Sequence, residues 1–549
     1  MRSISKNVLS IMLAAMIFIL SLAGCGSSSR ETKTSTTAST AATAAATTAE
    51  SGGNFQKTGM PIVKEPVTLD VLTVRWNNMD DSFKKNPFLT NLEKTSNVKI
   101  DWQWKAQSDW DTQKNIMLAS GTLPSLILGD LTLSETDIMN NVEYFLPLQN
   151  LVKEYMPNYT KALNEDSYLK GYVTYPDGNM YSMGSRMPSR PYVTFLPTIN
   201  KAWLDRLGLQ VPTNMDELYN VLKAFKDKDA NGNGDPNDEI PYSGSAKDAL
   251  FDPTILINFG INELNGKYMS MADGKPAFFP TMDGFKQCVE MLHKWYQEGI
   301  MDKEYFTQDY TMLVSKYQSD PSRIGFLYSW VPDAQFTTTK SEYIAIPPLT
   351  GPDGKKHAGG DPNGLGYRRL GLEITKFCKY PEVAARWADE FYTGEASIQN
   401  FWGGIGTVIT KNSDGTYELN NPPEGTGADK WYWDSSLRDF GPKYASPEFE
   451  KNIKLSKDSG DGLKLELDSM GKDYIVDPYP ATLFTLDEAQ ETATFRVDIE
   501  KYVQTTTAKW ITQGGIDEEW DSYVKQLDSM NVKRLVEVYT DAYNRFVGK

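Results

Sequence analysis

The sequence predicts an α/β protein with a mainly parallel sheet in its N-terminal part and enough chain for two lobes. The first observation is length, because 549 residues exceed what one hydrophobic core usually organises. The second is the order of elements between residues 66 and 130, where strand-like and helix-like segments alternate. That alternation is typical of parallel strands joined by helices that cover the sheet.

The N-terminus has the pattern of a secretory signal. Arg2 and Lys6 precede an apolar stretch at residues 8–23 that is too short for a membrane span. It ends in Leu-Ala-Gly-Cys at 22–25, which resembles a bacterial lipobox, where the cysteine is lipidated and becomes the first mature residue. We therefore expect residues 1–24 to be a signal peptide. We expect Cys25 to be lipidated, with palmitate among the attached acyl chains. An ordinary signal peptide with an incidental cysteine is the alternative.

Residues 25–60 are the expected lipidated cysteine and flexible tether. The segment 26–53 is almost entirely Ser, Thr, Ala and Gly, so it has too little apolar surface to offset the entropy of ordering. No later apolar run approaches the roughly 20 residues of a membrane-spanning helix. Cys25 is therefore the one membrane attachment that the sequence predicts.

Composition excludes several classes of function. The formal net charge of −16 argues against binding of nucleic acid and against direct adhesion to anionic lipid. Cys288 and Cys378 lie in helix-like apolar settings, which favours buried free thiols over a disulfide. His293 and His357 are far apart and lack metal-ligand spacing, so a histidine-based zinc site is not expected.

The N-terminal sheet is predicted from five segments: strand 67–74, helix 86–94, strand 98–104, helix 109–120 and strand 125–130. Ligands of such sheets gather beyond the carboxyl ends of the strands, which is where Trp76 and Asp130 lie. A further strand is expected at 192–200, followed by helices at 201–209 and 215–226.

Several segments resemble one known family. Residues 199–226 resemble the "INKKWLDKLGL-x-VP-T-x-DE" segment of extracellular solute-binding proteins that serve oligosaccharide ABC transporters. The closest resemblance is to the long subfamily with LipO-type lipoproteins and alginate-oligosaccharide-binding proteins. ASGTLP at 119–124, YPEVAARW at 380–387, and WDSYV at 520–524 with AYNR at 542–545 resemble further motifs, so the likeness extends over most of the mature chain.

The resemblance implies a periplasmic-binding-protein-like clamshell of two α/β lobes, each with a mostly parallel sheet, that closes on a ligand. The implied lobes are residues 61–198 plus 348–396 and residues 199–347 plus 397–549, with crossovers near 198, 347–348 and 393–400. The implied partners are an oligosaccharide and the permease subunits of an ABC transporter. We expect a monomer on the outer face of a Gram-positive cell membrane. The chain has no Walker motif, so ATP hydrolysis belongs to another subunit.

The most specific local motif is DKDANGNGDPNDEIP at 227–241. Ca²⁺ takes six to eight oxygen ligands, which alternating Asp and Asn side chains around glycines can supply. The loop resembles the EF-hand-like loop of the alginate-binding relatives. That resemblance implies calcium ligands from the side chains of Asp229, Asn231 and Asn233, the backbone oxygen of Asp235, and Asp238 with Glu239. A register that starts at Asp227 and an acidic loop without metal are the alternatives. Pro241 discourages a following helix, so the predicted calcium is structural.

Aromatic rings at strand ends and in glycine loops are the predicted sugar-binding residues. A ring stacked on a pyranose face buries C–H area while polar neighbours bind the hydroxyls. The rings are Trp76, Trp330, Trp402, Trp431 and Trp433, with Arg75, Asp130 and Arg369 as polar partners. Core packing is the alternative for each ring, and it is what we expect of Trp203, Trp387 and Trp510 on apolar helix faces.

A secreted glycosidase or polysaccharide lyase with a catalytic carboxylate pair is the competing class of function. No sequence feature singles out such a pair, and the chain has no Gly-x-Ser-x-Gly or His-Glu-x-x-His motif. A receptor ectodomain is disfavoured because no predicted transmembrane helix would pass a signal inward. The sequence therefore predicts a binding protein that is not an enzyme.

Overall fold

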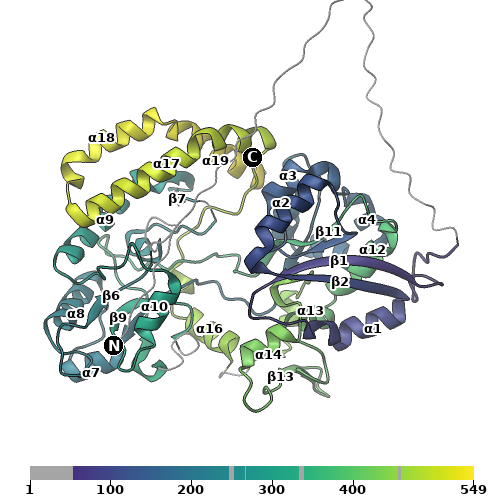
Figure 1. The fold of residues 1–549 in the computed structure, drawn as a ribbon, viewed down its shortest axis with the longest axis horizontal. Helices are drawn as coiled ribbons and strands as arrows, with labels where there is room; N and C mark the ends of the chain where they lie inside the picture. The colour runs from purple at the N-terminus through teal and green to yellow at the C-terminus, as the bar shows by residue number, and fades with distance from the viewer. Residues whose placement is uncertain (1–52, 246–252, 266, 333–338, 456–458, 549) are drawn as a thin grey trace, which may run out of the picture. The chain divides into compact units, whose positions relative to one another are not determined.

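The structure is a computed structural model that describes residues 53–245, 253–265, 267–332, 339–455 and 459–548 (Figure 1). The predicted signal peptide, Cys25 and the tether up to residue 52 lie outside the described residues. Residues 53–60 of the predicted tether are described. Phe55 pairs with Val63 in a β-bridge, and the backbone N–H of Gln56 donates to the carbonyl of Ile62 at 2.8 Å. Structured chain therefore begins within the predicted tether.

The first lobe is built on a five-stranded sheet. Its order is β2-β1-β3-β11-β4, with bounds Val98–Ala106, Val67–Arg75, Leu126–Leu128, Tyr367–Ile374 and Met183–Arg186. Strand β1 runs parallel to β2 and β3, as the alternating pattern predicts. Strand β11 is antiparallel to both β3 and β4, so the sheet is mixed and not mostly parallel. Strand β11 enters from far along the chain, and no local pattern determines its direction.

Short-range capping explains the first helices of this lobe. Helix α1 (Pro87–Ser96) begins where the Asn86 side chain accepts a hydrogen bond from the Phe88 N–H and proline occupies the first position. Helix α2 (Trp110–Ser120) ends before Gly121, whose φ of +63° suits glycine. The other helices of the lobe are α3 (Glu135–Asn140), α4 (Gln149–Tyr155), α5 (Pro157–Glu165), α6 (Ser167–Val173), α12 (Pro381–Asp389), α13 (Gly394–Phe401), α14 (Ala428–Asp434) and α15 (Pro447–Glu450).

The second lobe has a four-stranded sheet of order β10-β5-β9-β6. The strands are Tyr343–Ala345, Leu196–Asn200, Ile324–Ser329 and Ile240–Tyr242. Strand β5 is antiparallel to β10 and β9, and only β6 and β9 pair in parallel. The prediction of a mostly parallel sheet is wrong for this lobe, because β5 pairs antiparallel with two strands that lie more than 100 residues later in the chain. A separate hairpin pairs β7 (Met269–Ala272) with β8 (Lys275–Phe278).

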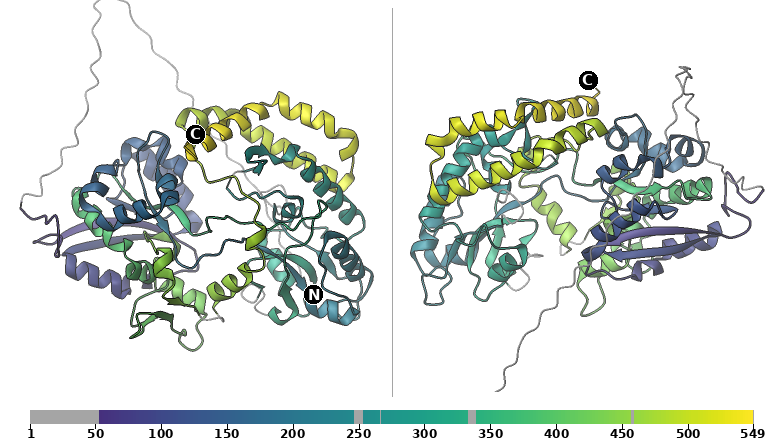
Figure 2. Two further views of the ribbon diagram at one scale, coloured as in Figure 1. Left: turned by 180° about the vertical axis from the view of Figure 1, so that it is seen from behind. Right: turned by 45° about the horizontal axis from the view of Figure 1, so that its top comes forward.

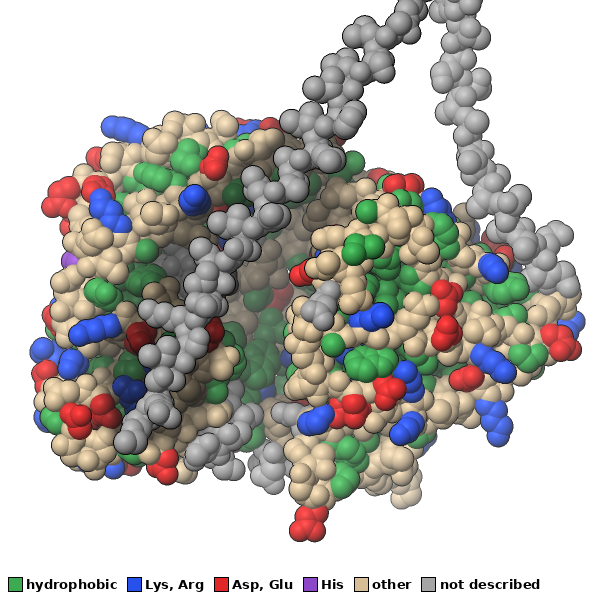
Figure 3. Space-filling view, in the orientation of Figure 1, with side chains coloured by type: hydrophobic (Ala, Val, Ile, Leu, Met, Phe, Trp, Pro, Cys, Tyr) green, Lys and Arg blue, Asp and Glu red, His purple; other side chains and the backbone are tan. Residues whose placement is uncertain are grey.

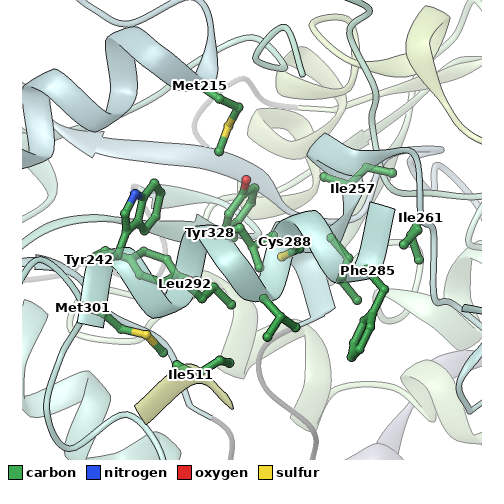
Figure 4. Packing of buried hydrophobic residues seen from close by; sticks show 14 of the residues in the cluster. Met215, Tyr242, Ile257, Ile261, Phe285, Cys288, Leu292, Met301, Tyr328 and Ile511 are labelled. Atoms are coloured by element: carbon green, nitrogen blue, oxygen red, sulfur yellow. The ribbon is translucent and has the colours of Figure 1, made fainter. Parts of the chain in front are cut away.

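Amphipathic helices form the core of the second lobe. The helices are α7 (Lys201–Leu207), α8 (Met215–Asp227), α9 (Asp283–Gln297), α10 (Tyr310–Tyr317), α17 (Leu486–Gln513), α18 (Ile516–Ser529) and α19 (Val532–Phe546). In Figure 4, Phe285, Cys288 and Leu292 lie along α9 among the other residues of this buried cluster. Figures 1 and 2 show α17 and α18 beside α9, which agrees with the contacts between these helices.

The remaining expectations about the core are largely confirmed. Trp203, Trp387 and Trp510 are fully buried. Cys288 and Cys378 are free, buried thiols in different core clusters, as the sequence predicts. None of the helices in the described part of the chain combines the length and the hydropathy of a membrane-spanning segment.

Residues 397–455 pack with the first lobe, although the family resemblance implies that they belong to the second. Leu437 and Tyr444 lie in the core of the first lobe beside Leu372 and Ile374 of β11. Trp402 and its neighbours form an adjacent cluster with Met187 of the first lobe. A small sheet of β12 (Ile409–Lys411), β13 (Tyr417–Leu419) and β14 (Ile453–Lys454) completes this region. The third crossover therefore follows β14 and does not lie at 393–400.

The three segments that connect the lobes pair with one another. We define the crossover ladder as residues 190–194, 358–361 and 474–476. Thr194 N–H donates to Gly359 O (2.9 Å), and Ala358 N–H donates to Tyr474 O (2.8 Å). Helix α16 (Gly460–Asp468) packs beside the ladder, where an oxygen of Asp468 accepts the N–H groups of residues 192 and 193. The crossovers thus form one hydrogen-bonded unit.

Candidate functional site

A cavity of about 820 Å³ is lined by residues of both lobes and of the crossover ladder. This volume lies within the usual range of small-ligand sites. On the face drawn in Figure 3, hydrophobic side chains lie in the hollow between the lobes. The lining residues are Trp76, Tyr168, Tyr172, Arg190, Thr194, Phe195, Leu264, Asn265, Tyr310, Trp330, Asp361, Gly364, Leu365, Tyr367, Arg368, Trp433 and Ala481.

Two tryptophans line this cavity from strand ends in different lobes. Trp76 directly follows β1, and its ring packs edge-on against Phe440 with centroids 5.8 Å apart. Its indole Nε1 is buried and has no hydrogen-bond partner among the described residues. Trp330 directly follows β9 and packs edge-on against Phe195 at 6.1 Å. The carboxyl ends of β1 and β9 thus bring an aromatic ring of each lobe to one cavity.

A group of three tyrosines extends the aromatic lining of the cavity. Tyr168 and Tyr172, one turn apart on α6, are stacked with centroids 5.8 Å apart. Tyr367 at the start of β11 packs edge-on against Tyr168 at 4.7 Å, and its hydroxyl donates to Asp166 at 2.7 Å. Burial raises the pKa of Tyr168, so its hydroxyl stays protonated. Sequence reasoning missed these rings, although a Tyr-x-x-x-Tyr spacing on a helix places both on one face.

The basic side chains near Trp330 are paired. Arg190 lies 5.5 Å from the Trp330 ring, and its Nη1 is 3.3 Å from Asp461 Oδ1. Lys464 lies 4.2 Å from the same ring and donates to the carbonyl of Thr194. Burial lowers the pKa of Lys464 to about 7. Both basic groups lie within about 6 Å of the centroid of a cavity-lining ring, which is a favourable cation–π distance.

Asp461 at the start of α16 is the shared acceptor of this region. Its Oδ2 accepts hydrogen bonds from Trp402 Nε1 at 2.9 Å and from Arg438 Nη2 at 3.2 Å. Burial opposes ionisation of this carboxyl, but Arg438 and Arg190 outweigh burial and lower its pKa. Asp461 thus joins the first lobe to the crossover ladder.

The structure brings some of the predicted ligand residues to the cavity. Trp76, Trp330 and Trp433 line it. Asp130 does not line it, but its Oδ2 lies 3.2 Å from Nε of Arg368, which does. Burial raises the pKa of Asp130 in spite of that arginine.

Four other predicted ligand residues lie outside the lining. Trp402 is fully buried in a core cluster, and Trp431 packs half-buried against the same cluster. Arg75 is also fully buried, and its guanidinium donates to the backbone oxygens of Trp433 and Ser436. Burial lowers the pKa of Arg75 to about 10. None of these three side chains belongs to the lining of the cavity.

Arg369 is the fourth of these residues, and it lies one position from the lining residue Arg368. Its side chain is 3% exposed, with Nη1 2.8 Å from Glu135 Oε1. Its Nε donates to the carbonyl of Tyr172 at 2.6 Å and its Nη2 to the carbonyl of Ala481. Successive side chains on β11 point to opposite faces, which separates the two arginines. Arg369 therefore holds two cavity-lining segments in place through their backbones.

The predicted calcium loop is a chain of turns closed by its own side chains. Asp229 accepts the N–H groups of Gly232 (2.8 Å) and Gly234 (2.9 Å), and Asn231 Oδ1 accepts the N–H of Asn233 (2.9 Å). Gly232 has a φ of +76°, and a Cβ there would lie 2.6 Å from Arg206 Nε. The loop therefore needs glycine at this position.

Two acidic groups point into the same loop. Asp238 accepts from the amide nitrogens of Asn231 and Asn233, each at 2.9 Å. Glu239 Oε1 accepts from the N–H of Ala230 at 2.8 Å, whereas its buried Oε2 has no partner among the described residues. Burial raises the pKa of Glu239. In the described chain, no three His, Cys, Asp or Glu side chains form a metal cluster by themselves, so a metal here would also need amide or backbone oxygens.

A second cavity, of about 750 Å³, lies on the first lobe alone. Its lining includes Lys57, Glu154, Lys161 and Arg386, and one aromatic residue, Tyr155. This cavity draws no residue from the second lobe. It lacks the facing aromatic rings of the larger cavity, which is therefore the better candidate for a carbohydrate site.

Comparisons with known proteins agree with this arrangement. A profile described as bacterial extracellular solute-binding protein matches residues 76–398. The fructooligosaccharide ABC transporter substrate-binding protein FusA of Streptococcus pneumoniae serotype 4 is 31% identical over 477 residues, which cover 83% of this chain and 86% of FusA.

Solved structures show the same likeness. FusA of S. pneumoniae in complex with kestose, and a FusA EF-hand mutant in complex with fructo-nystose, each give a TM-score of 0.74 at 29% identity, covering 88% of this chain and 100% of theirs. An HMO-binding, ABC-transporter-associated solute-binding protein of Bifidobacterium longum infantis gives 0.77 at 27% identity, covering 88% and 99%. The two-lobe α/β architecture is the periplasmic-binding-protein-like fold that the sequence predicts. This chain belongs to the bacterial extracellular solute-binding protein family.

Proposed function

We propose that this protein captures an oligosaccharide in the cavity between its lobes and delivers it unaltered to an ABC import permease. The observation that carries the proposal is one cavity lined by Trp76 and Trp330 from opposite lobes, together with the three first-lobe tyrosines described above. Aromatic faces bury the C–H surface of sugar rings, which is the contact that these rings offer to a ligand. The names of the relatives, which bind fructooligosaccharides and HMO, support the same class of ligand.

Titration calorimetry with a panel of neutral and acidic tri- to pentasaccharides tests this proposal. We expect saturable binding of at least one panel member. Trp76→Ala and Trp330→Ala should each weaken that binding at least tenfold, because burying one ring against a sugar contributes more than about 1.4 kcal/mol. Trp431→Ala is the matched control, since Trp431 does not line the cavity. Equal affinity in all three variants would contradict the proposed site.

The competing proposal of a carbohydrate-active enzyme is tested in the same samples. Chromatography of each oligosaccharide after overnight incubation with the protein should show only the starting compound. Shorter products would identify the protein as a glycosidase and unsaturated products as a lyase, whatever its affinity for the oligosaccharide.

A bound Ca²⁺ in the loop 227–241 is part of the proposal. The residues fit such an ion, because Asp and Asn oxygens surround two glycine turns and one oxygen of Glu239 is buried without a partner. The side chains of Asp229, Asn231, Asn233, Asp238 and Glu239, with the backbone oxygen of Asp235, would hold it. Calcium would supply a structural crosslink of the loop. The EF-hand of the pneumococcal relative supports this assignment.

Thermal unfolding with and without a chelator tests the calcium proposal. At a free Ca²⁺ concentration 100 times the dissociation constant, binding stabilises the folded state by about 2.7 kcal/mol, so the melting temperature should fall after chelation. Glu239→Gln should remove this dependence on calcium. Asp227→Asn should keep it if the ligands begin at Asp229, and should weaken it if the register begins at Asp227. An unchanged melting temperature after chelation of the wild-type protein would contradict the proposal.

Export and anchoring through lipidated, palmitate-bearing Cys25 complete the proposal, with the protein on the outer face of a Gram-positive membrane as a monomer. The resemblance of residues 22–25 to a lipobox supports it. In cells, Cys25→Ser should move the protein from the membrane fraction to the medium. Retention of this variant in the membrane fraction would contradict the anchor.

A further inference from the structure

We propose that the cavity selects neutral oligosaccharides over acidic ones and that Asp361 is a specificity-determining residue. This inference rests on the proposed function and names its ligand class more closely. Among the described residues that line the cavity, the side chains with a formal charge are Arg190, Arg368 and Asp361. The affinity for an acidic sugar depends on which of these charged side chains already has a partner of opposite charge within the protein.

Both arginines already have carboxylate partners. Arg190 Nη1 lies 3.3 Å from Asp461 Oδ1, and both side chains are less than a fifth exposed. Arg368 Nε lies 3.2 Å from Asp130 Oδ2. A ligand carboxylate would have to compete with a partner that is held in place by the fold. The positive charges of the lining are therefore largely cancelled before a ligand arrives.

Lys464 does not give the cavity a positive charge that could bind an acidic sugar. Its Nζ lies 4.2 Å from the centroid of the Trp330 ring and donates to the carbonyl of Thr194. Burial lowers its pKa to about 7, so close to neutral pH it is only partly charged. Lys464 is not among the residues that line the cavity.

Asp361, by contrast, has no cationic partner in the part of the chain that the structure describes. It lies on the crossover ladder and is 7% exposed. Its backbone N–H donates to Tyr192 O at 2.9 Å, and its carbonyl accepts from Gly364 N–H at 2.9 Å. Its Oδ1 accepts from the N–H (2.8 Å) and the side-chain amide (3.0 Å) of Asn363. The carboxylate is therefore fixed in a rigid turn.

The second oxygen of Asp361 is the functional atom in this inference. No hydrogen bond to its Oδ2 is present among the described residues. A fixed carboxylate oxygen is a strong acceptor for sugar hydroxyls, because charge-assisted hydrogen bonds are about twice as strong as neutral ones. The same negative charge repels a carboxylate on the ligand, and Asp477 nearby adds to that repulsion. One residue thus both attracts neutral sugars and disfavours acidic ones.

Matched ligand pairs test the selectivity in the full-length mature protein. Each pair consists of an acidic oligosaccharide and its uncharged counterpart: tetragalacturonate and its carboxyl-reduced form, tetramannuronate and its reduced form, and a sialylated milk oligosaccharide with its asialo form. Calorimetry at pH 7.5 should give at least 30-fold tighter binding of the neutral member in every pair that binds. Tighter or equal binding of the acidic member would overturn the inference and leave the proposed function intact. Binding of no member would overturn both.

Asp361→Asn tests the residue itself. The amide keeps an oxygen for the turn with Asn363 but loses the charge, so affinity for the neutral ligand should fall about tenfold and the preference over the acidic member should narrow. Asp414→Asn is the matched control, because Asp414 accepts the N–H two residues ahead in the same way (2.9 Å to Thr416) and lies outside the cavity lining. An unchanged preference in Asp361→Asn overturns its role. If that variant does not fold, calorimetry of the wild-type protein with the matched ligand pairs still tests the selectivity for neutral sugars.

Discussion

Replacement of Trp402 should have different effects according to the structure and according to the sequence pattern. The sequence pattern, with glycines at 403, 404 and 406, predicts a sugar-binding ring. The structure instead places this ring at the end of α13, fully buried beside Phe401 with ring centroids 5.0 Å apart. Its indole nitrogen donates to Asp461 at 2.9 Å. Trp402→Ala should therefore act on stability first.

The size of the effect follows from these contacts. Truncation of a fully buried tryptophan to alanine costs about 3–5 kcal/mol. Loss of a buried hydrogen bond to a charged acceptor adds about 1.5–3 kcal/mol, of which part is recovered because Asp461 keeps Arg190 and Arg438. We expect a loss of about 5 kcal/mol for Trp402→Ala. Trp402→Phe retains most of the ring and should lose about 2 kcal/mol.

Urea unfolding followed by circular dichroism measures both losses, and calorimetry measures sugar binding of the variant that remains folded. Trp402→Phe should bind with wild-type affinity in the folded state. The control is Trp76→Ala, where a half-buried ring at the cavity is lost and stability should change by less than half as much. A Trp402→Ala protein with the wild-type urea midpoint but without sugar binding would refute the structural role assigned to this residue.

Three further outcomes are expected. Burial lowers the pKa of Lys464 to about 7 in the folded state, whereas an unfolded lysine has a pKa of about 10.4. Between these values the unfolded state binds more protons, so the free energy of unfolding should rise with pH by up to about 5 kcal/mol. Urea unfolding of Lys464→Met at several pH values should show that this rise is lost. Burial raises the pKa of Cys288, so this thiol should react with Ellman's reagent only after denaturation. Gly360→Ala places a Cβ 2.1 Å from Tyr192 O, so thermal unfolding should show a loss of at least about 2 kcal/mol.

The parts of the fold that the sequence predicts well are those that local chemistry determines. Strands β1 and β2 and helices α1 and α2 follow from hydrophobic periodicity, an Asn-Pro start and a glycine stop. The antiparallel insertion of β11 between β3 and β4 was not predictable in this way, because its partners lie about 180 to 245 residues earlier in the chain. The position of the third crossover failed for a related reason, since α13 is apolar on a face that either lobe could bury.

The candidate site shows the same division. A rule about strand ends singled out Trp76 and Trp330, which line the cavity, and that rule depends only on the strand that each residue follows. Trp402 was misassigned because adjacent glycines show where a loop begins and not which way a ring points. Arg369 was chosen one position away from Arg368, since only the register of β11 decides which arginine faces the cavity. The tyrosines of α6 needed knowledge of what α6 packs against.

The crossover ladder has a consequence for how the two lobes can move. Its three backbones are joined by hydrogen bonds, such as that from Asp361 N–H to Tyr192 O, so none of them can bend independently of the other two. We expect relative rotation of the lobes to leave these bonds intact. Because Asp361 belongs to this bonded unit, we expect its carboxylate to move less than Trp76 and Trp330 when the lobes rotate.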